Sequence, residues 1–346
     1  MIGFYRAAFL GDNVIAIKAL LMLRHSYDGD IIIYTNTQGA QIFSKLSGFI
    51  CVDSSAMSKQ ELLAHINAQH FECFILTQPN RWRCKLLAQS NAKRIISFAT
   101  LANLFNPRIS KVFFSRAFSQ IPYHKALCKL VAKVDSKRFA KASTDFSSSI
   151  YPQFRYPIDE SAKARVQNTL DSATHYLITP KHTPSPKSPA NLAPIICLNP
   201  FVKSTRINLP LSAYIDLAYK LAARFESMRF IILHYDGAPT PCLQDPPPNV
   251  FVFSNDDNLA NLIELLRLSC LLISPSTGTI HLADMLHIPT IGIYNRKDSR
   301  LWLGDSMQKQ HLVILQKPLE QSSAQAIEQA QKRVYTLACA MLEPHS

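Results

Sequence analysis

Small polar residues with a glycine and a histidine among them form the chemically most suggestive cluster in this chain. They follow an apolar run, 271–273, and precede a second one, 290–294, and the residues concerned are Ser276, Thr277, Gly278, Thr279 and His281. The pattern is typical of a strand, a tight turn, a short helix and a second strand. A helix start presents free N–H groups and a partial positive charge, which suit a phosphate. We therefore expect a nucleotide diphosphate here, although plain helix capping and a histidine without a ligand role fit the same residues.

A second candidate lies near the amino terminus, where Gly11-Asp12 separates the apolar run 3–9 from a helical pattern over 13–24. A carboxylate at the carboxyl end of a strand points into the crevice where α/β proteins bind ligands. Such a group can take a proton as a general base. The alternative is that Asp12 only caps the helix that follows it.

The string 271–294 resembles the carboxyl-half signature of the heptosyltransferases, glycosyltransferase family 9, which runs S-x-D-T-G-x-x-H-L-A-A-A-L-G-x-P. The residues that correspond to it are Ser274, Ser276, Thr277, Gly278, His281, Leu282, Ala283, Leu286 and Pro289. Ser276 replaces the family's aspartate, which is expected to hold sugar hydroxyls. Asp284 stands where the family has a small residue, and it could orient His281, contact the sugar or only complement the helix dipole. In this family a G-D pair sits where Gly11-Asp12 sits here, and the resemblance implies that Asp12 is the general base.

Two further segments resemble family loops that carry cations. After the expected strand 195–199 come Lys203, Ser204, Thr205 and Arg206, and after the expected strand 290–294 comes Arg296. Cations and hydroxyls at these places could neutralise a departing diphosphate. An ordinary polar loop is the alternative for 203–206. No DxD motif in a metal-binding setting is present, so we expect no metal and no cofactor, with a helix dipole and basic side chains in the role of the ion.

Charge is unevenly distributed along this chain of net charge +13. The stretch 81–141 holds fourteen Lys/Arg and a single acid, Asp135. Such a stretch can attract nucleic acid, anionic lipid or a phosphorylated substrate, or it can be a solvated basic face. Nothing in it matches a zinc finger, an RNP motif or a coiled-coil basic region.

Membrane-span, secretory and disulfide-rich classes do not fit the sequence. No apolar stretch reaches the roughly 18–20 residues of a span. Arg6, Gly11, Asp12 and Lys18 interrupt the apolar amino terminus, which predicts a strand and a helix instead of a signal peptide. The eight cysteines form no CxxC pair, which favours reduced thiols in a cytosolic protein.

Alternation of strands and helices predicts an α/β protein of two doubly wound, Rossmann-like domains. We expect an amino-terminal, acceptor-binding domain at 1–178, a proline-rich linker at 179–194 and a nucleotide-sugar-binding domain at 195–321. The expected strands are 3–9, 30–35, 49–52, 72–76 and 93–97, then 195–199, 229–234, 250–253, 270–274 and 290–294. The family resemblance adds a GT-B arrangement, with the site in a cleft between the domains and the helix 322–342 packed back on the first domain.

The resemblance implies an inverting, metal-independent transferase that moves a heptose from a nucleotide diphosphate, ADP-heptose, to an anionic lipopolysaccharide or lipooligosaccharide core. It places the protein in the cytoplasm, in peripheral contact with the inner membrane, and without a nucleic-acid partner. Two alternatives remain open. One is a GT-B enzyme with another nucleotide sugar or an epimerase activity. The other is a non-catalytic module that binds anionic glycolipid or nucleic acid through 81–141.

Overall fold

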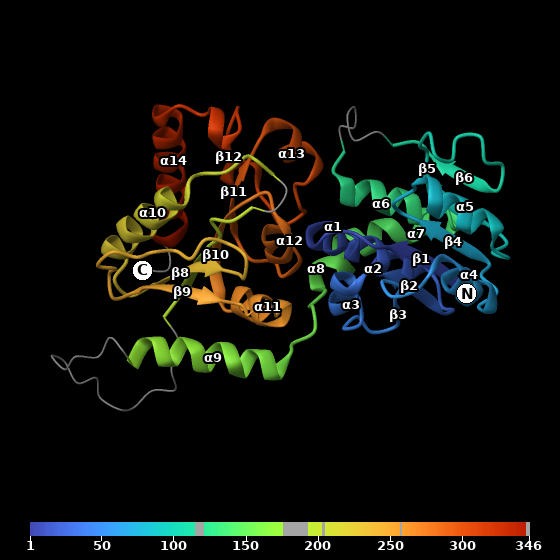
Figure 1. Cartoon of the computed structure of the whole chain (residues 1–346), viewed down its shortest axis with the longest axis horizontal. Coiled ribbons are helices and arrows are strands. Elements are labelled where there is room, and N and C mark those ends of the chain that lie inside the picture. Colours follow the sequence, from blue (N-terminus) through green and yellow to red (C-terminus); the bar gives the residue numbers. More distant parts are fainter. Residues whose placement is uncertain (115–120, 176–192, 203–204, 257, 344–346) are drawn as a thin grey trace. The chain divides into compact units, whose positions relative to one another are not determined.

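The computed structural model describes residues 1–114, 121–175, 193–202, 205–256 and 258–343. The chain divides into two compact units. The first contains Met1–Pro157 and Arg300–Gly304, and the second contains Ile158–Ser299 and Asp305–Ser346. Each unit is built on a six-stranded parallel sheet with helices around it (Figure 1). The expected α/β class with two Rossmann-like domains is confirmed.

In the first unit, the strand order is β3-β2-β1-β4-β5-β6 and every pairing is parallel. All residues of β1, β2, β4 and β5 are buried. Burial on both faces is the reason why these strands are mainly apolar in sequence, with Arg6, Thr35 and Ser97 as their buried polar residues. The strands are β1 (Ile2–Arg6), β2 (Ile31–Thr35), β3 (Ile50–Asp53), β4 (Cys73–Leu76), β5 (Ile95–Phe98) and β6 (Ile109–Val112).

Helices cover both faces of this sheet because its strands alternate their side chains between two buried layers. On one face, Tyr34, Phe74 and Leu76 share a core with residues of α4 and α5. On the other, Phe4, Ile33 and Ile75 are fully buried. The helices are α1 (Leu10–Ile15), α2 (Ile17–Ser26), α3 (Thr37–Phe43), α4 (Lys59–Ala68), α5 (Arg81–Gln89), α6 (Tyr123–Val131), α7 (Ser136–Asp145) and α8 (Tyr151–Gln153), with a π-turn at Phe146–Ile150.

The second sheet repeats the first, with the order β12-β11-β10-β7-β8-β9, again wholly parallel. Numbered from its own first strand, β7, this is the same arrangement as in the first unit. Its strands are β7 (Ile195–Leu198), β8 (Arg229–His234), β9 (Val250–Ser254), β10 (Ser269–Pro275), β11 (Thr290–Tyr294) and β12 (Leu312–Ile314).

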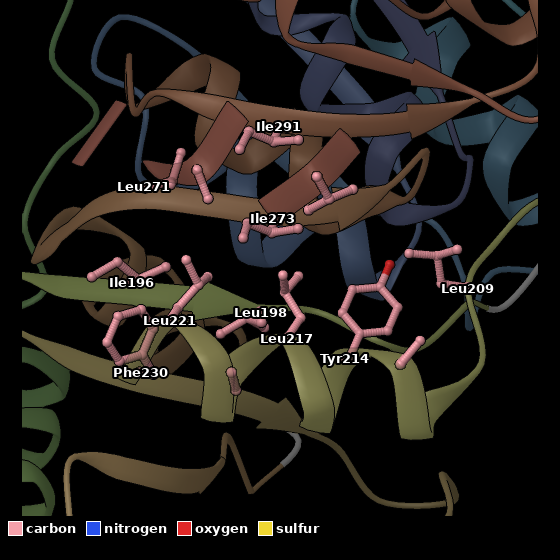
Figure 2. Close-up of a cluster of buried hydrophobic side chains, with 14 of the residues drawn as sticks. Ile196, Leu198, Leu209, Tyr214, Leu217, Leu221, Phe230, Leu271, Ile273 and Ile291 are labelled. Carbon is pink, nitrogen blue, oxygen red and sulfur yellow. The ribbon is translucent and has the colours of Figure 1, made fainter. Parts of the chain in front are cut away.

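One face of the second sheet carries the core drawn in Figure 2, in which Leu198, Leu271 and Ile273 meet Leu217 and Leu221 of α10. Its helices are α9 (Glu160–His175), α10 (Leu211–Arg224), α11 (Leu259–Arg267), α12 (Gly278–Met285) and α14 (Ala324–Leu342). The short helix α13 (Arg296–Leu301) has its last two residues in the first unit, and 3-10 turns lie at Lys309–His311 and Leu319–Gln321.

The structure differs from the expected domain limits at two helices. Helix α9, placed by sequence in the first domain, belongs to the second unit, where Asp159 N–H donates to Glu264 at 3.1 Å and Arg165 to Asn261 at 3.2 Å. Helix α14 was expected to pack on the first domain. Its buried residues Val334, Ala338 and Leu342 instead join the core of the second unit. Of the expected linker 179–194, all but the last two residues lie outside the described residues.

Two strands were not expected, and both are short strands at a sheet edge. Strand β6 is half-exposed and carries Lys111, and β12 has three residues. Within the described ranges, no helix combines the length and apolar character of a membrane span. All eight cysteines are free thiols.

Candidate active site

The strand order of each sheet creates one place suited to a ligand. Where successive connections leave in opposite directions, a crevice opens outside the carboxyl ends of two neighbouring strands. In the first unit these strands are β1 and β4, followed by Ala7–Asp12 and Thr77–Asn80. In the second they are β7 and β10, followed by Asn199 and by Ser276–Gly278. The two sequence candidates therefore lie at equivalent points of two equivalent sheets.

At the first of these points, the structure contains a pocket of about 690 Å³. Asp12 is one of the residues that line it, and its role as a general base stays a prediction. The other lining residues come from the ends of β1, β2, β4 and β5, from α5, from the segment after β6 and from the start of α6: Ala7, Ala8, Phe9, Asn36, Thr77, Gln78, Pro79, Asn80, Arg83, Phe98, Ala99, Thr100, Phe114 and Tyr123.

Asp12 is not the cap of its helix. Helix α1 begins at Leu10, earlier than expected, and Phe9 holds the N-cap position without a side-chain hydrogen bond. Asp12 lies in the first turn, with its side chain 22 % exposed. The capping alternative therefore does not describe Asp12, whose carboxylate makes an ion pair instead.

That ion pair is with Arg6, a fully buried side chain at the end of β1. Arg6 Nη2 lies 3.5 Å from Asp12 Oδ1. The Nε of Arg6 donates to the Asp12 carbonyl at 3.0 Å, Nη2 donates to the same oxygen, and Nη1 donates to Tyr123 Oη at 3.1 Å. A guanidinium holds a partner by several donors in a fixed plane. Arg6 thus fixes both the backbone and the carboxylate of Asp12.

One arginine, Arg83, lines the pocket itself. Arg83, on α5, donates to Gln78 O at 3.2 Å and to Ala7 O at 3.4 Å, and its guanidinium lies 5.0 Å from the centre of the Tyr5 ring. These are neutral partners, so the positive charge of Arg83 is retained beside the pocket. Arg83 belongs to the basic stretch 81–141, and no local pattern in the sequence marks it as a site residue.

At the second point, the turn after β10 leads into helix α12, whose start is open, meaning that no side chain caps it. Thr277 is the N-cap of α12, but its side chain makes no cap hydrogen bond. Its Oγ1 instead accepts from Asn199 Nδ2 at 3.1 Å, and the same amide donates to Ser274 Oγ at 3.1 Å. The amide of Asn199, which is buried, thereby ties β7 to the turn after β10. Because the Thr277 side chain does not accept from the first N–H groups of α12, these groups can donate to a bound ligand.

Ser276 and Asp284 have partners within the second unit. Burial raises the pKa of Tyr294 well above its ordinary value, and the nearby Asp284 raises it further. A side-chain hydrogen bond with Ser276 lowers this pKa, but by less than burial raises it. Asp284 Oδ1 accepts from the Ser306 N–H at 2.8 Å. That contact holds the segment around Ser306 to α12, and the role of Asp284 toward sugar or His281 stays a prediction.

His281 is the fourth residue of α12 and is buried, while Thr279 is half-buried in its first turn. In the loop after β7, Thr205 Oγ1 accepts from the Ile207 N–H at 3.1 Å, and Arg206 is exposed. Lys203 and Ser204 lie outside the described residues. Arg296 begins α13 and is exposed.

The loop after β7 is fixed to the body of the second unit by a buried amide. Asn208 Nδ2 donates to Pro200 O at 2.6 Å, and its Oδ1 accepts from Tyr214 Oη of α10 at 2.8 Å. Sequence reasoning missed Asn199 and Asn208. An asparagine directly after a buried strand is the feature that could have revealed the first.

No protein-family model matches the sequence, and a search of curated proteins finds no match either. The fold does match solved structures along the whole chain. A glycosyl transferase of family 9 from Veillonella parvula superimposes with a TM-score of 0.73 at 17% identity, covering 99% of this chain and 97% of that one. ADP-heptose LPS heptosyltransferase II from E. coli gives 0.73 at 12% identity, over 99% of both chains. E. coli heptosyltransferase WaaC, solved with ADP, gives 0.64 at 17% identity, over 96% and 99%.

This chain has the heptosyltransferase fold. Within that fold, the sequence candidates fall into two groups, with Asp12 in the first unit and the Ser276–His281 turn, Thr205, Arg206, Asp284 and Arg296 in the second. Among the described residues, no group of His, Cys, Asp or Glu side chains could hold a metal ion.

Proposed function

We propose that this protein is an inverting glycosyltransferase that moves a heptose from ADP-heptose to the core of a lipopolysaccharide or lipooligosaccharide. The observation that carries the proposal is the pairing of two different sites at equivalent points of two equivalent sheets. A carboxylate lines a pocket in the first unit, and an open helix start lies in the second. The heptosyltransferase fold supports this assignment of acceptor and donor.

In the proposed reaction, Asp12 takes the proton of an acceptor hydroxyl held in the pocket. The hydroxyl oxygen attacks the anomeric carbon of the donor sugar as the bond from that carbon to the phosphate oxygen breaks. ADP leaves with the electron pair of the broken bond, and the anomeric configuration inverts. General-base catalysis of this kind contributes roughly 10²–10⁴-fold. Arg6 keeps the carboxylate of Asp12 where the proton is transferred.

We assign the developing charge on the diphosphate to the start of α12, with Ser276, Thr277, Gly278, Thr279 and His281. Backbone N–H groups and the helix dipole stabilise such charge without a metal. Arg206 and Arg296 are exposed cations that can add to this, and Lys203, Ser204 and Thr205 complete the proposed donor-binding set. The E. coli enzyme WaaC, solved with ADP, supports ADP as the nucleotide.

The acceptor is proposed to be anionic, since Arg83 keeps its charge beside the pocket and the net charge of the chain is +13. The proposed acceptors are glycolipids, which are anchored in a membrane. We therefore propose that the protein works in the cytoplasm, at the cytoplasmic face of the inner membrane. A nucleic-acid partner is not part of the proposal.

The decisive experiment measures ADP release from ADP-heptose with and without a deacylated inner-core acceptor, beside GDP- and UDP-sugars. We expect release that depends on the acceptor, and a fall of at least about 10²-fold in turnover for Asp12→Asn with the donor KM nearly unchanged, because the amide cannot accept the proton. The control is Asp53→Asn, which changes an exposed acid of the same unit. Asn13, the neighbour of Asp12, is unsuitable as a control position because it is fully buried.

Other outcomes of this assay separate the alternatives. Release only with another nucleotide sugar would show a different GT-B activity. Folded protein that releases nothing from any donor, yet binds glycolipid or nucleic acid with a steep salt dependence, would refute the transferase and show a binding module.

Metal independence has its own test. Turnover after EDTA treatment is expected to equal that of the untreated protein, because N–H groups and cations take the role of the divalent ion. Loss of turnover with EDTA that Mg²⁺ or Mn²⁺ restores would contradict this part of the proposal.

A further inference from the structure

Three large apolar side chains of the first unit are almost fully exposed, and all of them lie on the segment that contains the β5–β6 loop and the end of β6. Leu101 is 92 %, Phe105 90 % and Phe113 80 % exposed. Single apolar residues on a surface need no explanation, but several on one short segment mark an interaction site. We call Leu101, Phe105 and Phe113 the apolar rim.

The exposure of the apolar rim is built into the fold. The loop that follows β5 is fixed by Asn103, whose side chain is 1 % exposed. Asn103 Nδ2 donates to Phe98 O at 2.8 Å, and its Oδ1 accepts from the Thr100 N–H at 2.9 Å. A chain anchored on both sides of Leu101 holds that side chain outward at the cost of leaving it in water.

Phe113 is displayed by the alternation of an extended chain. Its neighbour Phe114 packs inward, with its ring centre 5.4 Å from that of Phe98 and 5.7 Å from that of Tyr123. Phe113 therefore faces away from the unit.

Two members of the apolar rim are the chain neighbours of residues that line the pocket containing Asp12. Leu101 follows Thr100 and Phe113 precedes Phe114, and both Thr100 and Phe114 line the pocket. The two segments run side by side, since the Ala99 N–H donates to Val112 O at 2.9 Å. A surface that held the rim would lie at the edge of the pocket.

Positive charge accompanies the apolar rim. Residues 101–114 contain Arg108 and Lys111 and no acid. Arg108 donates to the carbonyls of Ala88, Ser90 and Ala92, and Lys111 to that of Asn106. Because these acceptors are neutral, both cations keep their charge. Apolar side chains beside uncompensated cations are the combination that binds an anionic membrane interface.

We propose that the apolar rim inserts into an anionic lipid bilayer and brings the Asp12 pocket to the headgroup layer. The inference deepens the proposed function, because a lipid-linked acceptor would be presented at that layer, but the binding itself can be measured without any transfer reaction. Single side chains that project from a turn suit a fluid interface, which adapts to their shape.

The test is co-sedimentation of the full chain with vesicles of phosphatidylglycerol and phosphatidylethanolamine, compared with phosphatidylcholine vesicles. We expect binding to the anionic vesicles and a fall of about tenfold or more for the triple variant Leu101→Ser/Phe105→Ser/Phe113→Ser. Lys111→Gln, which keeps a hydrogen-bond donor, should bind about fivefold more weakly. Ile50→Ser is the matched control, because Ile50 is an exposed apolar residue of β3, at the opposite edge of the same sheet.

Unchanged vesicle binding in the triple variant, with melting as in the wild type, would overturn the inference. So would light scattering that shows a wild-type dimer and a monomeric triple variant, since the rim would then bind a second copy. Transfer to a deacylated acceptor should be unchanged in the triple variant. Failure of that transfer in the wild type would count against the proposed function alone.

Discussion

At the scale of single residues, the first unit depends on a buried arginine that no local pattern explains. Arg6 interrupts an apolar run, and its partners Thr77 and Tyr123 are 71 and 117 residues away. The sequence placed Asp12 at the end of a strand but gave no reason for Arg6. Its role follows from folding, which puts the guanidinium against the backbone and carboxylate of Asp12.

Arg6→Lys tests whether this contact positions Asp12. Lysine keeps the charge but loses the planar set of donors, so we expect kcat to fall roughly 10- to 100-fold while the donor KM stays unchanged. Arg24→Lys is the matched control, because Arg24 also binds backbone carbonyls of the same unit, those of Gly29 and Gly48. Equal losses in both variants would indicate a general effect on folding instead of positioning.

At the same scale, the donor-side residues were only partly predictable. Thr277 occupies the N-cap position expected from its type, yet its hydroxyl accepts from Asn199, which lies 78 residues away. Capping propensity is a local property, whereas this hydrogen bond depends on the pairing of β7 with β10. The sequence identified the turn but could not say which partner its hydroxyl would take.

At the scale of elements, predictability followed burial. Strands covered on both faces, such as β2 and β4, have mainly apolar sequences and were found. The edge strand β6, with Ser110 and Lys111 between Ile109 and Val112, has no such run and was missed. Helices α9 and α14 pack on the second unit through contacts between residues distant in sequence. Hydrophobic periodicity is a local property, so it does not predict on which unit a helix packs.

The position of α14 leads to a stability prediction. Leu342 is 1 % exposed and belongs to the core of the second unit, so Leu342→Ala should lower the free energy of unfolding by roughly 2–5 kcal/mol. Lys332→Ala, at an exposed position of the same helix, should change it little. The measurement is urea unfolding followed by circular dichroism. A Leu342→Ala midpoint equal to that of Lys332→Ala would contradict the packing described for α14.

At the scale of the whole molecule, the sequence predicted the class and the alternation of strands and helices, whereas strand order came from the structure. Both sheets have the order that places a crevice between their first and fourth strands. Neighbouring strands pair through contacts between distant segments, so composition and spacing do not determine which strand lies next to which.

Thiol chemistry offers a check on the whole fold. Burial raises the pKa of Cys51 and of Cys73 to about 11, and that of Cys197 to about 12. At pH 8 a thiol with a pKa near 11 is ionised to about one part in a thousand, so these groups should react slowly. Cys242 is exposed and should give the one fast phase with a disulfide reagent, which Cys242→Ser removes.

In denaturant the unfolded chain should show eight reactive thiols with similar rates, since every cysteine is free. A fast phase of several thiols in the native protein, or its persistence in Cys242→Ser, would contradict the burial described here.

The engaged hydroxyl of Thr277 has a consequence for the protein without its ligand. A helix whose cap side chain is turned away forgoes about 1 kcal/mol that ordinary capping provides. If the proposed diphosphate binds at α12, it supplies the missing acceptor and so returns that free energy on binding. The molecule thus exchanges a little of its own stability for affinity, and the resting protein should be measurably easier to unfold than the occupied one.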